Sequence, residues 1–386
     1  PPMELNCVEQ HMKDSLASNF DDRMLTIGRT ANITGDKAFE NRGPCQFRNR
    51  CIRGCPYGGY FSSQSSTLPH AEATGNMTLR PDAIVHSIIY DPNTGKATGV
   101  KVIDANTKEE LAFYSKIIFL NASAVASSAF LLQSKSDRFP DGMGNDSGEL
   151  GHNLMDHHLD VGAYGRFDGF HDKYFKGRRP NGIYIPRFRN LGDEKSKADY
   201  LRGFGYQGGA SRGNWRNMVK ELSFGEDLKE DLMTPGDWTM GLGGFGECLP
   251  YHENRMYLDY DKLDQWGLPT VTFDSDYREN EKLMRVDMMN SAAEMLDKAG
   301  FKDIVTYNAE IGMGLGIHEM GTARMGLDPE TSVLNAYNQV HAVPNVFVTD
   351  GAAMTSAGCQ NPSLTYMALT ARACDYAVKE LKAGRL

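Results

Sequence analysis

Residues 116–133 read Lys116-Ile-Ile-Phe-Leu-Asn-Ala-Ser-Ala-Val-Ala-Ser-Ser-Ala-Phe-Leu-Leu-Gln133, an apolar strand followed directly by a helix of small residues. The apolar run ends at Leu120, and the helical segment begins at Val125. The residues between them are mostly small, so the backbone can approach a ligand at the carboxyl end of the strand. The stretch therefore predicts a strand–helix unit of an α/β fold with a ligand at its edge.

The region before this stretch has the pattern of a small antiparallel sheet. Residues 83–91, 98–105 and 111–121 alternate between apolar and polar positions or run apolar. Turn-forming residues separate them at 92–95 and 106–109. The pattern predicts a three-stranded meander whose last strand leads into the helix 125–133.

Residues 160–275 change character, because aromatic residues and glycines are frequent and the strand signals are short. This predicts a second, antiparallel domain, followed by a helix over 278–298. The strand 346–349 and a helix over 362–381 then return to the first domain. The predicted boundaries are a connecting segment at 1–42, a first domain at 43–158 and 311–386, and a second domain at 159–310.

Composition limits the classes of protein that this chain can represent. Its 386 residues suffice for two domains, and its net charge of −9 argues against nucleic acid as a partner. No run approaches the roughly 18 apolar residues of a membrane helix. The chain begins Pro1-Pro2-Met3 without a basic region and an apolar segment, so we expect no signal peptide here. It reads like the middle of a longer protein.

A second informative region extends from His318 to Asn361 and combines three segments. It opens with His318-Glu-Met-Gly-Thr-Ala-Arg-Met-Gly326, continues through the strand-end segment 346–352, and closes at Asn361-Pro362. Asn361 is expected to cap a helix that has Pro362 in its first turn. The residues alone leave open whether Asn361 is only a cap and whether His318 is a proton acceptor or a structural histidine.

Several ordered motifs, taken together, are more specific than any one of them. The pattern His318-x2-Gly-Thr-x-Arg-Met-Gly resembles the C-terminal signature of the glucose-methanol-choline (GMC) oxidoreductases, in their sugar-dehydrogenase and pyranose-oxidase branch. The resemblance covers residues 40 to 386. Further motifs carry it, namely Asn345–Ala352, Gln360–Thr365, Gly151–His157 and Asp264–Pro269.

The resemblance implies an FAD-dependent enzyme that oxidises a sugar or glycoside hydroxyl to a carbonyl. His318 is then the base that takes the hydroxyl proton while hydride goes to flavin N5, and Asn361 holds the substrate oxygen. The histidines around Asp156 are structural or line the cofactor. The implied cofactor residues are Ala83 and Val85 near the adenine, Asn121, Ala122 and Ser123 near the adenosine, Asp350, Gly351 and Ala352 along the ribityl and pyrophosphate, and Pro362 and Ser363 at the helix start.

One departure from the family pattern is large. The Gly-x-Gly-x-x-Gly fingerprint that follows the first strand of a dinucleotide-binding domain does not occur, and Gly312-x-Gly314-x-Gly316 lacks its context. We therefore expect an incomplete, Rossmann-like FAD-binding domain that lacks its N-terminal part, beside an antiparallel substrate domain. The chain would be either a fragment or one of two chains that together form the whole.

Cys45, Cys51 and Cys55 lie within eleven residues, and Pro56 follows them. Three thiolates so close together can hold an iron–sulfur cluster, whereas a structural zinc site needs a fourth ligand that does not lie nearby. Three reduced cysteines are the other alternative. The resemblance favours a 3Fe–4S cluster, with electrons leaving to a cytochrome c and a small subunit as a further partner. A periplasmic location is compatible with the resemblance, but the sequence leaves the location open. The competing hypotheses are an oxygen-using oxidase without a cluster and an inactive fragment or scaffold.

Overall fold

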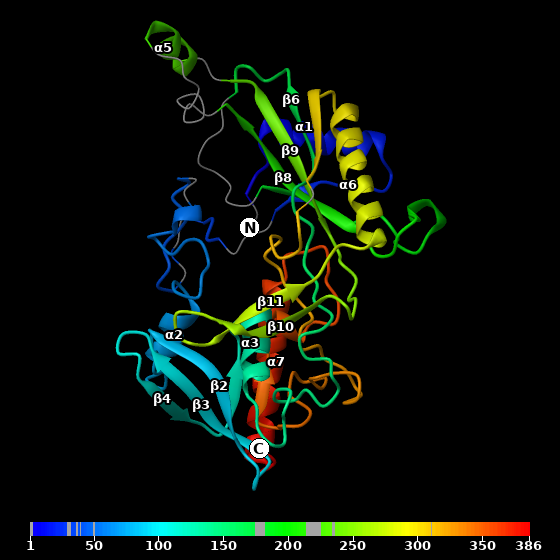
Figure 1. Ribbon diagram of the computed structural model, residues 1–386. Coiled ribbons are helices and arrows are strands. Elements are labelled where there is room, and N and C mark those ends of the chain that lie inside the picture. Colours follow the sequence, from blue (N-terminus) through cyan, green and yellow to red (C-terminus); the bar gives the residue numbers. More distant parts are fainter. Residues whose placement is uncertain are drawn as a thin grey trace. The chain divides into compact units, whose positions relative to one another are not determined.

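The computed structural model describes residues 3–28, 32–35, 38, 40–48, 51–173, 182–213, 225–233, 236–309 and 311–386 (Figure 1). It divides into two compact units. Unit 1 comprises Pro1–Leu79, Leu159–Gly246 and Lys282–Glu310, and unit 2 comprises Arg80–His158, Glu247–Glu281 and Ile311–Leu386. Each unit has a hydrophobic core of its own.

Unit 1 is built on a six-stranded antiparallel sheet with the order β1-β7-β8-β9-β6-β12. Two long helices, α1 and α6, contribute buried residues to the core against this sheet. Shorter helices complete the unit. The bounds are α1 Cys7–Asn19, β1 Thr26–Ile27, η1 Cys51–Arg53, α2 Thr67–Ala73, β6 Val161–Phe167, β7 Ile183–Ile185, η2 Glu194–Ser196, β8 Phe204–Arg212, α5 Glu226–Met233, β9 Trp238–Gly246, α6 Glu279–Lys298 and β12 Lys302–Asn308.

The first helix shows how local sequence and packing agree. Asn6 and Glu9 form a capping box, in which the Asn6 side chain accepts a hydrogen bond from Glu9 N at 3.0 Å and Glu9 accepts one from Asn6 N at 2.9 Å. The same two side chains also bond the backbone of Ala210 in β8. The capping residues therefore both start α1 and attach it to the sheet, although residues 1–42 were expected to be a connecting segment.

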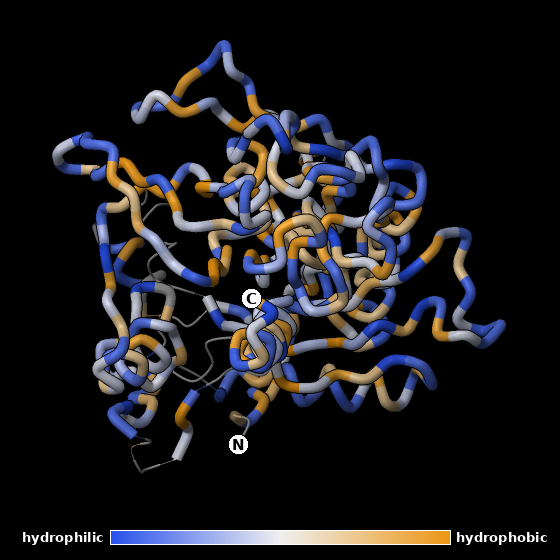
Figure 2. Tube along the Cα trace, turned by 90° about the horizontal axis from the view of Figure 1, so that it is seen from below, coloured by the Kyte–Doolittle hydropathy of each residue, from blue (hydrophilic) through white to orange (hydrophobic). Residues whose placement is uncertain are grey.

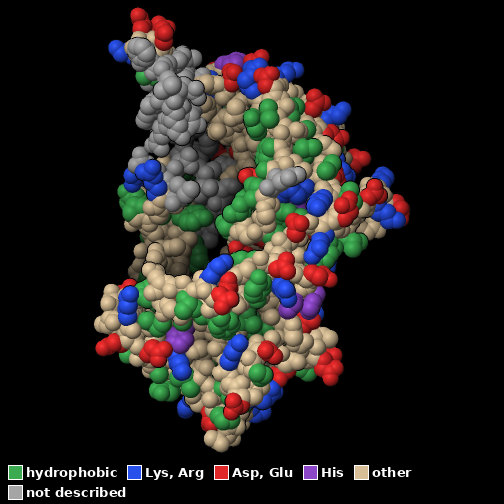
Figure 3. Space-filling view, in the orientation of Figure 1, with side chains coloured by type: hydrophobic (Ala, Val, Ile, Leu, Met, Phe, Trp, Pro, Cys, Tyr) green, Lys and Arg blue, Asp and Glu red, His purple; other side chains and the backbone are tan. Residues whose placement is uncertain are grey.

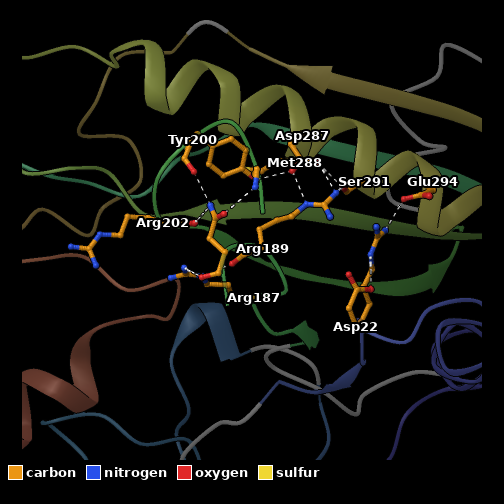
Figure 4. A network of polar contacts seen from close by, with 12 residues as sticks. Asp22, Arg187, Arg189, Tyr200, Arg202, Asp287, Met288, Ser291 and Glu294 are labelled. Atoms are coloured by element: carbon orange, nitrogen blue, oxygen red, sulfur yellow. Dashed lines mark hydrogen bonds and ion pairs between the residues drawn. The ribbon is translucent and has the colours of Figure 1, made fainter. Parts of the chain in front are cut away.

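A network of polar side chains connects residues 187–202, which follow β7, to α6 (Figure 4). Arg189 donates to both oxygens of Asp287, at 2.8 and 3.1 Å, and Tyr200 and Ser291 donate to the same carboxylate at 2.7 and 2.8 Å. Burial raises the pKa of Asp287, but these hydrogen bonds outweigh it and lower that pKa overall. The carboxylate therefore stabilises unit 1 in its charged form.

Unit 2 contains the predicted meander and a parallel strand pair. Strands β2, β3 and β4 pair antiparallel in that order, while β5 and β13 pair in parallel. A separate hairpin is formed by β10 and β11. The bounds are β2 Ala83–Asp91, β3 Lys96–Asp104, β4 Glu110–Tyr114, β5 Ile118–Leu120, α3 Ala124–Gln133, β10 Arg255–Leu263, β11 Pro269–Asp274, β13 Val346–Val348, η3 Gly351–Ala353 and α7 Ser363–Lys382.

The third predicted strand, 111–121, is wrong as a single element, because the chain leaves the meander after Tyr114. The buried side chain of Asn345 explains the break. Its Nδ2 donates to the carbonyl oxygens of Ala97 at 2.7 Å and Lys116 at 2.9 Å, and its Oδ1 accepts from Ala97 N at 2.9 Å. Asn345 thus links β3 to Lys116, two residues before β5, and it directly precedes β13. This holds β5 beside β13.

The helix at the C-terminus has the predicted position, and small residues form its buried face. Leu364, Met367 and Val378 are exposed, whereas Ala373 and Ala377 are buried. These two alanines pack against Phe347 of β13, since small side chains allow a helix to approach a strand closely.

Among the described residues no helix is long and apolar enough to cross a membrane. Hydrophilic positions interrupt the hydrophobic ones along the trace (Figure 2). On the face shown in Figure 3, acidic and basic side chains are interspersed rather than gathered into a basic patch.

Candidate active site

The loop that carries His318 is held by one buried carboxylate of unit 2. Asp156, which is 1% exposed, accepts hydrogen bonds from the backbone N–H groups of Gly314 at 2.8 Å, Gly316 at 2.9 Å and His318 at 3.0 Å. It also accepts one from His157 N at 2.7 Å. One side chain therefore joins the segment 156–157 to the loop 314–318.

The His318 ring lies between two side chains. Its Nδ1 is 2.8 Å from His157 Nδ1, and its Nε2 is 3.4 Å from the side-chain nitrogen of Asn361. On its other side, His157 Nε2 contacts the carbonyl oxygen of Gly358. The predicted pair of His318 and Asn361 is thus brought together in space.

Both histidines are shifted toward their neutral forms. Burial lowers the pKa of His157, against the opposing effects of the Gly358 carbonyl, Asp156 and Glu247. Burial also lowers the pKa of His318, and the neighbouring His157 adds to this while Asp156 opposes it. A neutral imidazole at position 318 can accept a proton.

Asn361 does not cap the last helix, so that prediction is wrong. The helix begins at Ser363, and Pro362 occupies the cap position without a side-chain hydrogen bond. The exposed Asn361 directs its amide nitrogen toward His318 instead. The amide is therefore placed to contact a group bound beside His318.

A second group of predicted residues meets where β5 and β13 end. Asp350 accepts hydrogen bonds from Ser123 N at 3.1 Å, from Ala352 N at 3.0 Å and from the Ser127 hydroxyl. Burial nevertheless raises the pKa of Asp350 overall. The carboxyl ends of parallel strands are where open α/β sheets bind ligands.

The remaining predicted residues of unit 2 lie on neighbouring elements. Ala83 and Val85 are half-buried in β2, where they pair with Asp104 and Val102. Asn121 accepts a hydrogen bond from the Thr349 hydroxyl, and Ala122 is exposed beside it. At the start of α7, Pro362 is buried and Ser363 is exposed, and Gly351 is buried after β13.

Tyr366 was missed by the sequence reasoning. Its hydroxyl is buried and has no hydrogen-bond partner among the described residues. It lies beside Gly351, where an added methyl group would come within 3.0 Å of it. A buried phenol without a partner fits a site that a cofactor with acceptor groups completes. No feature of the sequence singles out this tyrosine among the residues of the helix.

The three cysteines lie in unit 1, where they line one hollow of about 190 Å³ with Arg48 and Arg53. Burial raises the pKa of Cys55, but hydrogen bonds from the backbone of residues 57–60 lower it overall. In the described part of the chain, no group of three or more histidine, cysteine or acidic side chains could hold a metal ion. The predicted metal site at Cys45, Cys51 and Cys55 is therefore not supported, because lining one hollow does not bring the three thiols to a common centre.

Two family models, both described as GMC oxidoreductase, match the chain over residues 8–159 and 250–370. The chain belongs to the GMC oxidoreductase family. The prediction that the N-terminal part is lacking is wrong, since the match at residues 8–159 is to the N-terminal model of the family. That prediction relied on the absence of one short loop, Gly-x-Gly-x-x-Gly, and the N-terminal model matches residues 8–159 although this loop is absent.

Two relatives illustrate the range of this family. The 2-methyl-1,2-propanediol dehydrogenase of Mycolicibacterium austroafricanum is 32% identical over 346 residues, which cover 84% of this chain and 58% of that protein. The fructose dehydrogenase large subunit of Gluconobacter japonicus is 28% identical over 356 residues, which cover 90% of this chain and 62% of that protein. The chain therefore spans less than two thirds of the length of either relative.

Solved structures confirm the mixed α/β fold. The pyridoxine 4-oxidase from Mesorbium loti superposes with a TM-score of 0.58 at 15% identity, covering 98% of this chain and 70% of that one. A formate oxidase variant from Aspergillus oryzae RIB40 superposes with a TM-score of 0.59 at 16% identity, covering 84% and 64%.

Proposed function

We propose that the protein is an FAD-dependent oxidoreductase that converts the hydroxyl group of a sugar or a related alcohol into a carbonyl. The observation that carries this proposal is the pair formed by the half-buried His318 and the Asn361 amide, 3.4 Å apart. The names of the relatives agree with it, because they include a diol dehydrogenase, a fructose dehydrogenase and a paromamine 6'-oxidase.

The two side chains have complementary parts in such a reaction. His318, neutral because burial lowers its pKa, accepts the proton of the substrate hydroxyl. The Asn361 amide donates a hydrogen bond to the substrate oxygen and does not compete for its proton. When bound, the flavin supplies the hydride acceptor.

The FAD contacts are assigned to the residues predicted for them. They are Ala83, Val85, Asn121, Ala122, Ser123, Asp350, Gly351, Ala352, Pro362 and Ser363. The meeting of the β5 and β13 ends and the buried hydroxyl of Tyr366 support a cofactor at this edge of unit 2. The formate oxidase of similar fold is a protein in which FAD is modified, which also agrees with a flavin here.

The onward path of the electrons is a separate part of the proposal. One relative is named as a large subunit and another as a flavoprotein, which supports a partner such as a small subunit or a cytochrome c. Only one observation supports a 3Fe–4S cluster, namely that the three cysteines line one hollow. Iron analysis and a low-temperature paramagnetic spectrum of anaerobically purified protein test it, and iron well below one atom per chain would remove the cluster.

The substrate proposal is tested on the complete protein that contains these residues. Sugars, diols and aminoglycosides are screened with an artificial electron acceptor and, in parallel, with oxygen. Reduction of the dye by a hydroxyl compound, with bleaching of the flavin absorbance, is expected. Oxygen uptake without any response to the dye would instead favour the oxidase alternative. A protein that binds no flavin and oxidises no alcohol would contradict the proposal.

A further inference from the structure

Three contacts form a line through the candidate active site. They run from the Gly358 carbonyl to His157 Nε2, from His157 Nδ1 to His318 Nδ1 at 2.8 Å, and from His318 Nε2 to the Asn361 amide at 3.4 Å. All four residues belong to unit 2. Two imidazoles whose nitrogens are this close must share one proton between them, so the tautomer of each ring constrains the other.

The Gly358 carbonyl determines which nitrogen donates and which accepts in each of these hydrogen bonds. A carbonyl oxygen only accepts, so His157 Nε2 must carry a proton. Burial lowers the pKa of His157 and so favours its neutral form, in which the imidazole has a single N–H and Nδ1 is an acceptor. His318 Nδ1 must then be the donor in the 2.8 Å contact. The remaining nitrogen of His318, Nε2, carries the lone pair and is the one that faces Asn361.

We propose that His157 is a positioning residue that fixes His318 in its Nδ1-protonated tautomer, so that Nε2 is presented as the proton acceptor for the substrate hydroxyl. This inference rests on the proposed function, in which His318 is the base. The proton moves from the hydroxyl oxygen to Nε2, and the Nδ1–H bond to His157 persists in the resulting imidazolium. No other bond in the line has to break.

Asp156 also helps to position the two histidines. It holds the backbone N–H groups of both histidines, so the two rings are attached to one rigid point. The loop is shaped for this contact, because Gly314 has a φ of 101° and a methyl group at Gly316 would lie 2.7 Å from Asp156 Oδ1. Among the described residues, Asp156 and Glu247 are charged groups that favour a positive charge on His157, and Asp156 also favours one on His318.

The inference is tested by nitrogen NMR of the histidine-labelled protein, which reports the tautomer of each ring without any need for turnover. His318 is expected to be protonated on Nδ1 in the wild type, and its signal is identified by its loss in His318→Asn. A wild-type His318 protonated on Nε2 would overturn the inference. This measurement needs no variant of His157, so a folding defect cannot obscure it.

Substitution then tests the role of His157. His157→Leu removes the acceptor, so His318 should lose its bias toward one tautomer and kcat should fall about tenfold or more while KM stays within about twofold. His157→Gln, which keeps an acceptor, should recover part of the rate. His252→Leu is the control, because His252 lies in the same unit and its side chain is 56% exposed.

The outcomes separate this inference from the proposed function. An unchanged tautomer and an unchanged rate in His157→Leu would contradict the positioning role even if the protein oxidises sugars. If His318 is protonated on Nδ1 but the protein oxidises no alcohol, the positioning role of His157 is retained and the proposed function is rejected.

Discussion

At the scale of single residues, His318 is the side chain on which the proposed reaction depends most. Replacing it with alanine removes the proton acceptor, so turnover should fall at least about a hundredfold. Steady-state kinetics with the preferred substrate measure the change. The control is His171→Ala, since His171 is exposed in unit 1. Near-normal turnover in His318→Ala would exclude this histidine as the base.

The pH dependence of the reaction follows from the same residue. A base works only when it is unprotonated, and burial lowers the pKa of His318 below the ordinary value of about 6.5. Activity should therefore persist as the pH falls and be lost only below that value. The profile of kcat/KM against pH measures this in the free enzyme. An acid limb centred above pH 7 would show that another group controls the reaction.

Tyr366 provides a test of cofactor binding. A buried hydroxyl without a partner costs about 1–3 kcal/mol, so Tyr366→Phe should leave the flavin-free protein equally stable or more stable. If the cofactor satisfies this hydroxyl, the same change should weaken FAD binding about tenfold. Denaturant unfolding and flavin titration give the two values. Tyr376→Phe on the same helix is the control, and equal FAD affinity in both variants would contradict the assignment.

At the scale of elements, the attachment of the segment 187–202 to α6 depends on Asp287. Asp287→Asn loses the charge that Arg189 pairs with, so the free energy of unfolding should fall by about 2 kcal/mol at neutral pH. The pKa of Asp287 is lower in the folded than in the unfolded state. Its contribution to the free energy of unfolding is therefore fully present above the unfolded-state pKa, and it is lost as the pH falls through the folded-state pKa.

Denaturant unfolding of both proteins at several pH values measures this difference, which should shrink in acid. Asp297→Asn is the matched control, because Asp297 is an exposed residue of the same helix. A difference between Asp287→Asn and the wild type that stays constant down to low pH would show that the carboxylate charge is not the cause.

The elements also show where sequence patterns succeed. The helices predicted at 125–133 and 278–298 and the strands at 83–91 and 98–105 are confirmed within a few residues, because each has a clear local period. The strand 111–121 was wrong as a single element. There a distant partner, Asn345, decided the outcome.

At the scale of the whole molecule, the family assignment rests on motifs spread along the chain rather than on any one site. The missing Gly-x-Gly-x-x-Gly loop suggested that the N-terminal part of the FAD-binding domain was lacking, yet the N-terminal family model matches residues 8–159. The cysteine segment is a separate case. Its spacing suggested a metal site, which the described residues do not support. Spacing along the chain limits which residues can meet but does not place their side chains around a common point.

The sequence by itself determined the elements with a strong local period, the family, and the candidate pair of His318 and Asn361. These follow from local spacing and from the order of short motifs, which a linear chain records directly. Only the tertiary structure decided that His157, 161 residues before His318, contacts its ring, and that Asp156 holds both segments. It likewise decided that β5 joins β13. The physical reason is that such contacts depend on how distant backbone segments align, and this alignment is set by buried side chains whose partners lie far away in the chain.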